Sequence, residues 1–129
     1  MRDRQNVFSG SPYEAVMGYS RAVRVGDHVY VAGTAPIMPG GGDPPDDAYG
    51  QTKRCFEIIA AALGEAGASL EDVVRTRVFL VRVEDFDDVG RAHAEAFADI
   101  RPVNTTVLAG GLLNPSWLVE IEVDAVVTV

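Results

Sequence analysis

Three carboxylate side chains recur at every second position near the end of the chain, at Glu120, Glu122 and Asp124. They interrupt an apolar stretch, residues 117–127, that we expect to form a strand. Alternate residues of a strand point to opposite faces, so the three carboxylates share one face. A partly buried carboxylate has a raised pKa, which suits a general acid or base near neutral pH. Glu120 is our candidate for this proton chemistry.

The acidic row also has a structural interpretation. Arg75 and Arg77 alternate in the same way along another predicted strand, residues 73–82. Pairs of opposite charge on neighbouring strands stabilise a sheet. A ladder of ion pairs or a solvated face therefore explains the row as well as a catalytic site does, and the sequence leaves both open.

The histidines and the single cysteine carry less chemistry. His93 lies on the apolar face of a predicted helix, where a histidine is usually a hydrogen-bonded core residue, and His28 is expected at the surface. Cys55 lies on the buried stripe of another predicted helix, so we expect a core residue and not a nucleophile. Two histidines without Cys, Asp or Glu at ligand spacing make a poor metal site, and we expect no metal.

Hydrophobic periodicity predicts the elements that position these residues. Residues 1–19 are expected to form an irregular arm, and Gly26-Asp27 suits a type II′ hairpin turn. The expected elements are strands at 20–25 and 28–34, a helix capped by Asp46 or Asp47 and ended by Gly67, a strand at 73–82, a helix at 85–100, and strands at 103–109 and 117–127.

The helices should bury one stripe each. In the first, the stripe is Cys55, Ile59, Ala62, Leu63 and Ala66; in the second, it is Phe86, Val89, His93, Ala96, Phe97 and Ile100, with Asp85 as the cap and Asp88 three residues on. The order β-β-α-β-α-β-β predicts a single α+β domain over residues 1–129, a mixed sheet with two helices on one face. Because Phe79, Leu80 and Val81 are apolar on both sides of their strand, the other face needs cover, for which another subunit is the expected source.

Composition excludes several classes of function. The formal net charge is −8 with only 11 Lys and Arg residues, which disfavours nucleic acids and anionic membranes as partners. One cysteine cannot form an internal disulfide, and no apolar stretch reaches the roughly 18 residues that suggest a membrane helix. No hydrophobic signal region follows residues 1–6, so the cytoplasm is the expected location.

Six segments match a known pattern in order and spacing: residues 18–26, 31–36, 51–52, 70–80, 101–106 and 118–123. Through them, the chain resembles the Rid family, also called YjgF or L-PSP endoribonuclease-like, over nearly its whole length. The resemblance implies a chorismate-mutase-like fold and a homotrimer with clefts between subunits. Archetypal members hydrolyse enamines and imines to 2-oxo acids and ammonia without a cofactor. Their P-x-R-[ST] arginine holds the substrate carboxylate, and a glutamate of the last strand positions or activates water.

Carried over residue by residue, the resemblance makes Glu120 the catalytic glutamate. The residues that it implies along the cleft are Tyr19, Ala32, Gly33, Thr34, His93 and Thr106, with Asn104 in the arginine position. Arginine grips a carboxylate with two charge-assisted hydrogen bonds, whereas asparagine offers one neutral amide. Losing a charged hydrogen bond costs about 1.5–3 kcal/mol. We therefore expect a small-molecule site retuned away from simple 2-imino acids, toward a neutral or larger ligand.

Two functions stay open on this basis. One is a cofactor-independent imine hydrolase with altered substrate choice, and the other is a non-catalytic metabolite binder or regulator. The ribonuclease activity attached to part of the family is disfavoured by the negative charge of the chain.

Overall fold

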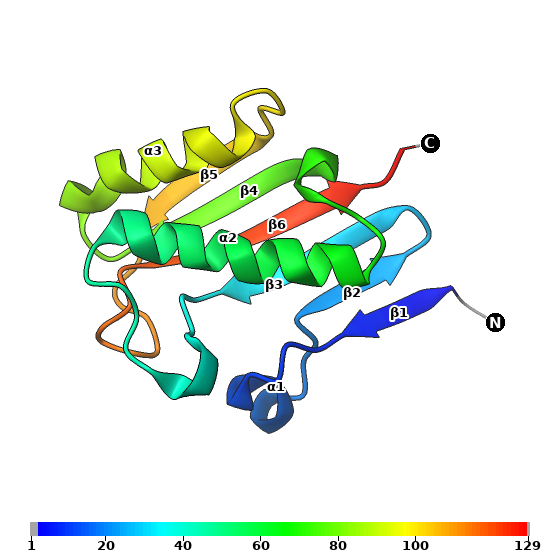
Figure 1. The fold of residues 1–129 in the computed structure, drawn as a ribbon, viewed down its shortest axis with the longest axis horizontal. Coiled ribbons are helices and arrows are strands. Elements are labelled where there is room, and N and C mark those ends of the chain that lie inside the picture. The colour runs from blue at the N-terminus through cyan, green and yellow to red at the C-terminus, as the bar shows by residue number, and fades with distance from the viewer. Residues whose placement is uncertain (1–2, 129) are drawn as a thin grey trace.

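A mixed sheet of six strands, in the order β1-β2-β3-β6-β4-β5, organises the computed structural model, which describes residues 3–128 (Figure 1). The strands are β1 Arg4–Val7, β2 Ala22–Val25, β3 His28–Thr34, β4 Val73–Leu80, β5 Val103–Leu108 and β6 Val119–Val126. The helices are α1 Pro12–Met17, α2 Ala48–Glu65 and α3 Phe86–Phe97, and the 3-10 turns are η1 Pro39–Gly41, η2 Leu70–Asp72 and η3 Val83–Asp85. The pair β4–β5 is parallel, and the other neighbouring strands are antiparallel.

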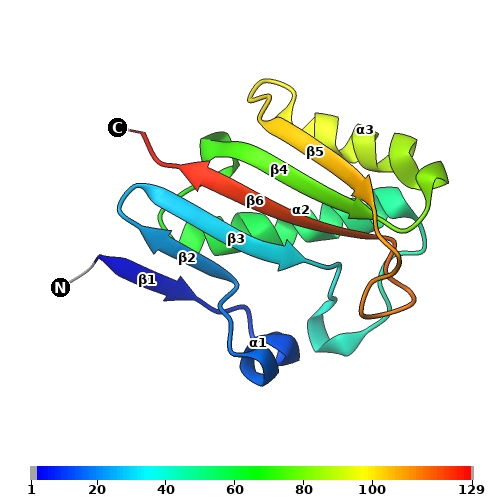
Figure 2. The same ribbon diagram turned by 180° about the vertical axis from the view of Figure 1, so that it is seen from behind.

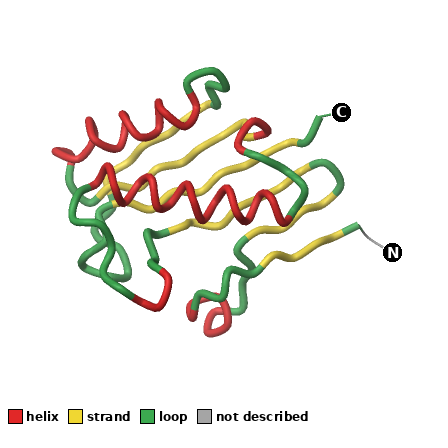
Figure 3. Tube along the Cα trace, in the orientation of Figure 1, coloured by secondary structure: helices red, strands yellow, loops and turns green. Residues whose placement is uncertain are grey.

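Helices α2 and α3 cover one face of the sheet, as the sequence predicted, and leave the opposite face open (Figures 1, 2 and 3). On β6, the side chains of Val119, Ile121, Val123 and Ala125 are buried beneath the helices. Glu120, Glu122 and Asp124 alternate with them and therefore lie on the open face. Among residues 3–128, no helix is long and apolar enough to span a membrane.

The hairpin and the first long helix were predicted correctly. Val25 pairs with His28 across the Gly26-Asp27 turn, where Gly26 has a φ of 60° and Asp27 does not have a positive φ. On α2, the Asp47 side chain caps the helix by accepting a hydrogen bond from the Gly50 amide at 2.7 Å. Gly67 follows the helix with a φ of 80°. All five residues of the predicted stripe are buried.

The prediction of an irregular arm at residues 1–19 was wrong over the part that the structure describes. Strand β1 pairs with β2, and α1 begins after Ser11, whose hydroxyl accepts a hydrogen bond from the Tyr13 amide. The order is therefore β-α-β-β-α-β-α-β-β. Both elements are short, with four and six residues. Segments of that length show too little periodicity to be recognised without the neighbours against which they pack.

Helix α3 begins at Phe86, directly after Asp85 as predicted, but the capping role predicted for Asp85 was wrong. Asp85 does not cap the helix; its carboxylate instead accepts two hydrogen bonds from Arg82, at 2.9 and 2.8 Å. Its backbone is already in the helical region, with φ −84° and ψ −3°, which is unsuited to an N-cap. Phe86 is 53% exposed and does not belong to the buried face, whereas Val89 and Phe97 do. The ends of several elements also shift: β2 begins at residue 22, β4 ends at 80, α3 ends at 97, and β5 ends at 108 while β6 spans 119–126.

A buried ion pair fastens α1 to the sheet. Arg21 and Glu14 are only 3% and 4% exposed, and Arg21 Nε lies 3.1 Å from Glu14 Oε2. Glu14 also accepts hydrogen bonds from the amide and the hydroxyl of Ser9. Burial by itself raises the pKa of Glu14, but the hydrogen bonds from Ser9 and Arg21 and the charge of Arg21 outweigh it and hold the pKa below its usual value.

Replacing Glu14 by Gln should lower the free energy of unfolding by about 3–5 kcal/mol at neutral pH, because Arg21 is left as an uncompensated buried charge. Urea unfolding measures this loss. Glu95→Gln is the control: it makes the same change in the ion pair between Lys53 and Glu95, whose side chains are 54% and 48% exposed, and should cost no more than about 1 kcal/mol.

The pKa of Glu14 is lowered by folding, so its ionised form contributes stability above the unfolded-state pKa and loses it as the pH falls through the folded-state value. The difference between wild type and Glu14→Gln should therefore shrink in acid. Equal losses from Glu14→Gln and Glu95→Gln would contradict the structural importance of the buried pair.

Candidate functional site

Glu120 lies on the open face of β6 with its carboxylate directly over Gly33 of β3. A Cβ atom added to Gly33 would come within 2.5 Å of Glu120 Oε2. The register between β3 and β6 shifts between Val31 and Thr34, so β3 carries a bulge at this point. Bulges and glycines in strands mark places where backbone and side chain approach closely. Here they make room for a half-buried carboxylate.

The surroundings of Glu120 alter its acidity. Burial raises the pKa of this carboxyl, the positive charge of Arg21 opposes the rise, and the negative charge of Glu122 adds to it. The net result is a pKa above the usual value. A carboxyl with a raised pKa exchanges protons closer to neutral pH, as a general acid or base requires.

Arg21 connects the predicted site residues around Gly33. Its guanidinium donates to the carbonyl oxygen of Gly33 at 2.7 Å and to Thr34 Oγ1 at 3.1 Å, and it lies 3.4 Å from the Tyr19 hydroxyl. Thr34 in turn donates to the carbonyl oxygen of Ala32 at 2.8 Å. The structure thus brings Tyr19, Ala32, Gly33, Thr34 and Glu120 together. The sequence did not single out Arg21; the only signal was a lone arginine at the start of an apolar strand.

Ion pairs occupy the remainder of the acidic row. These pairs are Arg75–Asp124 at 3.7 Å, Arg77–Glu122 at 3.6 Å and Arg77–Asp124 at 3.6 Å. The ladder interpretation is therefore confirmed for Glu122 and Asp124. Glu120 differs, because its register partner on β4 is Phe79 and not an arginine. A hollow of about 700 Å³ lies on the open face of the sheet, and Tyr19, Ala32, Arg77 and Glu122 line its wall.

The other predicted residues form a second group, held by a chain of side-chain hydrogen bonds. Thr106 Oγ1 donates to Asn104 Oδ1 at 2.9 Å, and Asn104 Nδ2 donates to Thr76 Oγ1 at 2.9 Å. Thr76 Oγ1 lies 2.9 Å from His93 Nε2. The Thr76 hydroxyl can donate to His93 Nε2 or accept from it, so the tautomer of the ring sets the direction of this hydrogen bond. Burial lowers the pKa of His93, in agreement with a neutral ring.

The two groups lie apart within one chain. Asn104 is the register partner of Thr76, which is fully buried beneath α3, so Asn104 points to the helix side of the edge strand β5. Glu120 points to the open face of β6, two strands away. Sequence position alone does not show this separation, because it depends on strand order and on the face to which each side chain points.

Comparison with known proteins gives consistent matches over most of the chain. A family model described as Endoribonuclease L-PSP matches residues 10–127. An uncharacterized protein of Streptomyces coelicolor is 44% identical over 125 residues, covering 94% of this chain and 90% of that protein.

Two crystal structures share the fold. A member of the YjgF/YER057c/UK114 family from Mycobacterium tuberculosis is 46% identical with a TM-score of 0.89, and the match covers 97% of this chain and 100% of that one. E. coli TdcF with bound serine is 25% identical with a TM-score of 0.80, over 95% of this chain and 94% of that one.

Gly33→Ala should push the Glu120 carboxylate away from the backbone, because the added Cβ would lie 2.5 Å from Oε2. The side chain can swing toward water, so we expect a small loss of stability and a fall of the Glu120 pKa toward its usual value. An NMR titration of the side-chain carboxyl carbons measures the pKa. Gly64→Ala is the control, since a Cβ there meets nothing within 4 Å, and it should leave the Glu120 pKa unchanged. An unchanged pKa in Gly33→Ala would contradict the close contact.

Proposed function

Because the chain belongs to the L-PSP endoribonuclease family, also called the YjgF or Rid family, we propose that it binds a small uncharged metabolite and hydrolyses an imine or enamine. The observation that carries this proposal is Glu120, a half-buried carboxylate over the Gly33 backbone with a raised pKa. It is the group on the open face best placed to move a proton near neutral pH.

Glu120 supplies the acid–base chemistry of the proposed hydrolysis. The ionised carboxylate accepts a proton from water while the water oxygen adds to the carbon of the C=N bond and the nitrogen takes up a proton. The resulting carbinolamine then collapses to a carbonyl compound and releases ammonia. One water is consumed for each imine, and the scheme requires no cofactor.

The charge distribution favours an uncharged substrate. The cations near the site are already engaged: Arg21 pairs with Glu14, and Arg77 pairs with Glu122 and Asp124. Asn104, in the position where family members have a carboxylate-binding arginine, has its amide bonded to neighbouring threonines. A substrate carboxylate would therefore gain little compensation for leaving water.

Assembly as a homotrimer is part of the proposal. Val25, Tyr30, Val103 and Val107 lie on the open face of the sheet and are 44–58% exposed, which leaves apolar surface for another subunit to cover. Asn104 lies on an edge strand, so a cleft between subunits can bring the Asn104 group of one subunit close to the Glu120 group of another. The serine in the TdcF structure supports a small-molecule ligand for this fold.

The proposal is tested by ammonia release from two freshly generated imines of matched size, 2-iminopropanamide and 2-iminopropanoate. The neutral amide should be the better substrate, and Glu120→Gln should lower its rate by about 10²–10⁴-fold, the usual contribution of a general acid or base. The rate should rise with pH as the carboxyl of Glu120 ionises.

Glu122→Gln is the matched control, because it changes the neighbouring carboxylate of the same strand face and should retain most of the activity. Ammonia release that is equal in wild type and Glu120→Gln would overturn the catalytic part of the proposal.

A non-catalytic metabolite binder or regulator is the second candidate. The observation that favours it is the neutral network of Asn104, Thr106, Thr76 and His93, at the position where the family resemblance implies a substrate-binding arginine. Stabilisation against heat by a metabolite that is recovered unchanged would support this candidate, and turnover of that metabolite would exclude it. The ribonuclease activity in the family's description is not carried over, because a net charge of −8 opposes binding of a polyanion.

A further inference from the structure

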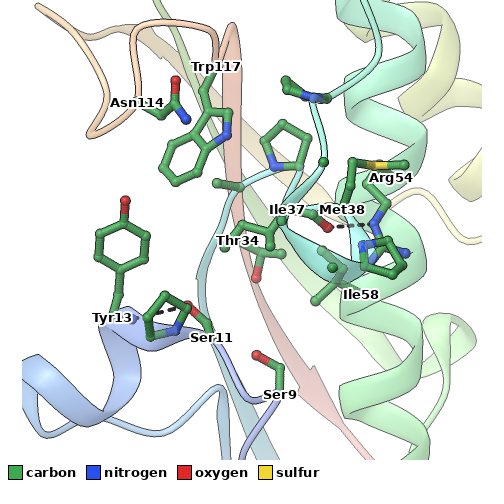
Figure 4. A pocket seen from close by; sticks show the side chains of 18 of the residues that line it. Ser9, Ser11, Tyr13, Thr34, Ile37, Met38, Arg54, Ile58, Asn114 and Trp117 are labelled. Carbon is green, nitrogen blue, oxygen red and sulfur yellow. Dashed lines mark hydrogen bonds between the residues drawn. The ribbon is translucent and has the colours of Figure 1, made fainter.

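A cavity of about 440 Å³ lies at the end of β3, where it shares Arg21 and Thr34 with the group around Glu120 (Figure 4). The rest of its wall is formed by residues 9–13 with the start of α1, by residues 35–44 after β3, by Arg54 and Ile58 of α2, and by Asn114, Ser116 and Trp117. Glu120 and Asn104 do not contribute to this wall. A volume of this size falls within the range of about 300–1,000 Å³ that small-molecule sites occupy.

The wall offers flat apolar surface on two sides. Tyr13 and Trp117 pack edge to face, with ring centroids 6.0 Å apart and an interplanar angle of 68°. Figure 4 shows them on one side of the cavity, with Ile37, Met38 and Ile58 on the other. The prolines of the wall are Pro12, Pro36, Pro39 and Pro44. Aromatic rings and prolines facing aliphatic side chains favour a planar apolar ligand.

Several polar groups of the wall remain available to a ligand, among them the amide of Asn114 and the hydroxyl of Tyr13. Asn114 Oδ1 accepts a hydrogen bond from the Ser116 amide at 2.8 Å. Within residues 3–128, neither Asn114 Nδ2 nor the Tyr13 hydroxyl has a hydrogen-bond partner in the protein. Both groups lie at the aromatic side of the cavity, so a ligand there can gain one or two hydrogen bonds that fix its orientation.

The two arginines of the wall are already engaged. Arg21 is paired with Glu14, and Arg54 donates to the Ile37 carbonyl oxygen at 2.8 Å and to Glu57 at 3.1 Å. Asp43 is exposed, so water screens its charge. An anionic ligand would therefore leave water without gaining a free cation, and a cationic ligand would gain only the screened charge of Asp43.

We infer that this cavity is a second ligand site, which takes a neutral, planar aromatic molecule with one hydrogen-bonding group. The Tyr13–Trp117 pair provides the face against which the ring stacks. Asn114 Nδ2 and the Tyr13 hydroxyl bind its polar group. The cavity opens between α1 and α2, whereas the proposed hydrolytic site is on the open face of the sheet.

The test uses three planar probes of matched shape: neutral 2-naphthamide, anionic 2-naphthoate and cationic 2-naphthamidine. Trp117 is the only tryptophan, so its single indole N–H resonance in an NMR spectrum reports on the cavity. 2-Naphthamide should shift this resonance saturably and bind about tenfold more tightly than either charged probe, because burial of an unpaired charge is costly.

Tyr13→Ala should weaken 2-naphthamide binding about fivefold by removing an aromatic contact. Tyr49→Ala is the matched control, since Tyr49 packs against Arg91 outside the cavity and should not affect binding. Ile58→Phe narrows the cavity from the α2 side and must weaken binding as well, which keeps the test decisive if Tyr13→Ala does not fold. The inference is overturned if 2-naphthamide leaves the Trp117 resonance unshifted, if a charged probe binds as tightly, or if Tyr49→Ala weakens binding as much as the cavity variants.

Discussion

Arg21 is buried with Glu14, and a charge removed from water in this way must find its hydrogen bonds within the protein. Its guanidinium does so by bridging three segments: it pairs with Glu14 of α1, donates to Gly33 and Thr34 at the end of β3, and lies beside Tyr19. The hydrogen bonds from Arg21 to Gly33 and Thr34 stabilise the β-bulge over which the Glu120 carboxylate lies. The second cavity has Arg21 and Thr34 in its wall, so both proposed sites depend on the same buried pair.

Some parts of the fold could be predicted from the sequence, because a single pattern of apolar residues there indicates both the type of element and its buried face. The alternation of β6 and the stripe of α2 are long enough to specify a face, and the Gly26-Asp27 turn follows from the backbone that glycine allows. β1 and α1 escaped prediction because they are stabilised by strand pairing and by the Arg21–Glu14 contact, which joins residues on different elements. The capping role predicted for Asp85 was wrong because its carboxylate accepts hydrogen bonds from Arg82 and not from the backbone amides of α3.

In the candidate site, the key residue could be predicted from the sequence, but its surroundings could not. Glu120 could be found from alternation, but its raised pKa depends on burial against Gly33, which only the pairing of β3 with β6 reveals. The chain from Thr106 to His93 joins β5, β4 and α3, and no sequence spacing suggests it. The structure adds to what was expected of Asn104, because its amide is part of a neutral hydrogen-bond network with Thr76 and Thr106.

The central claim is that Asn104 makes the site select uncharged ligands. Calorimetric titration of Asn104→Arg with pyruvate and with its neutral amide, pyruvamide, tests this claim most directly, with Asn104→Gln as a longer side chain without charge. A charged hydrogen bond is worth about 1.5–3 kcal/mol, so Asn104→Arg should bind pyruvate about 10–150-fold more tightly than wild type, while Asn104→Gln should not. Unchanged pyruvate binding in Asn104→Arg would contradict the account, because position 104 would then not control the charge of the ligand.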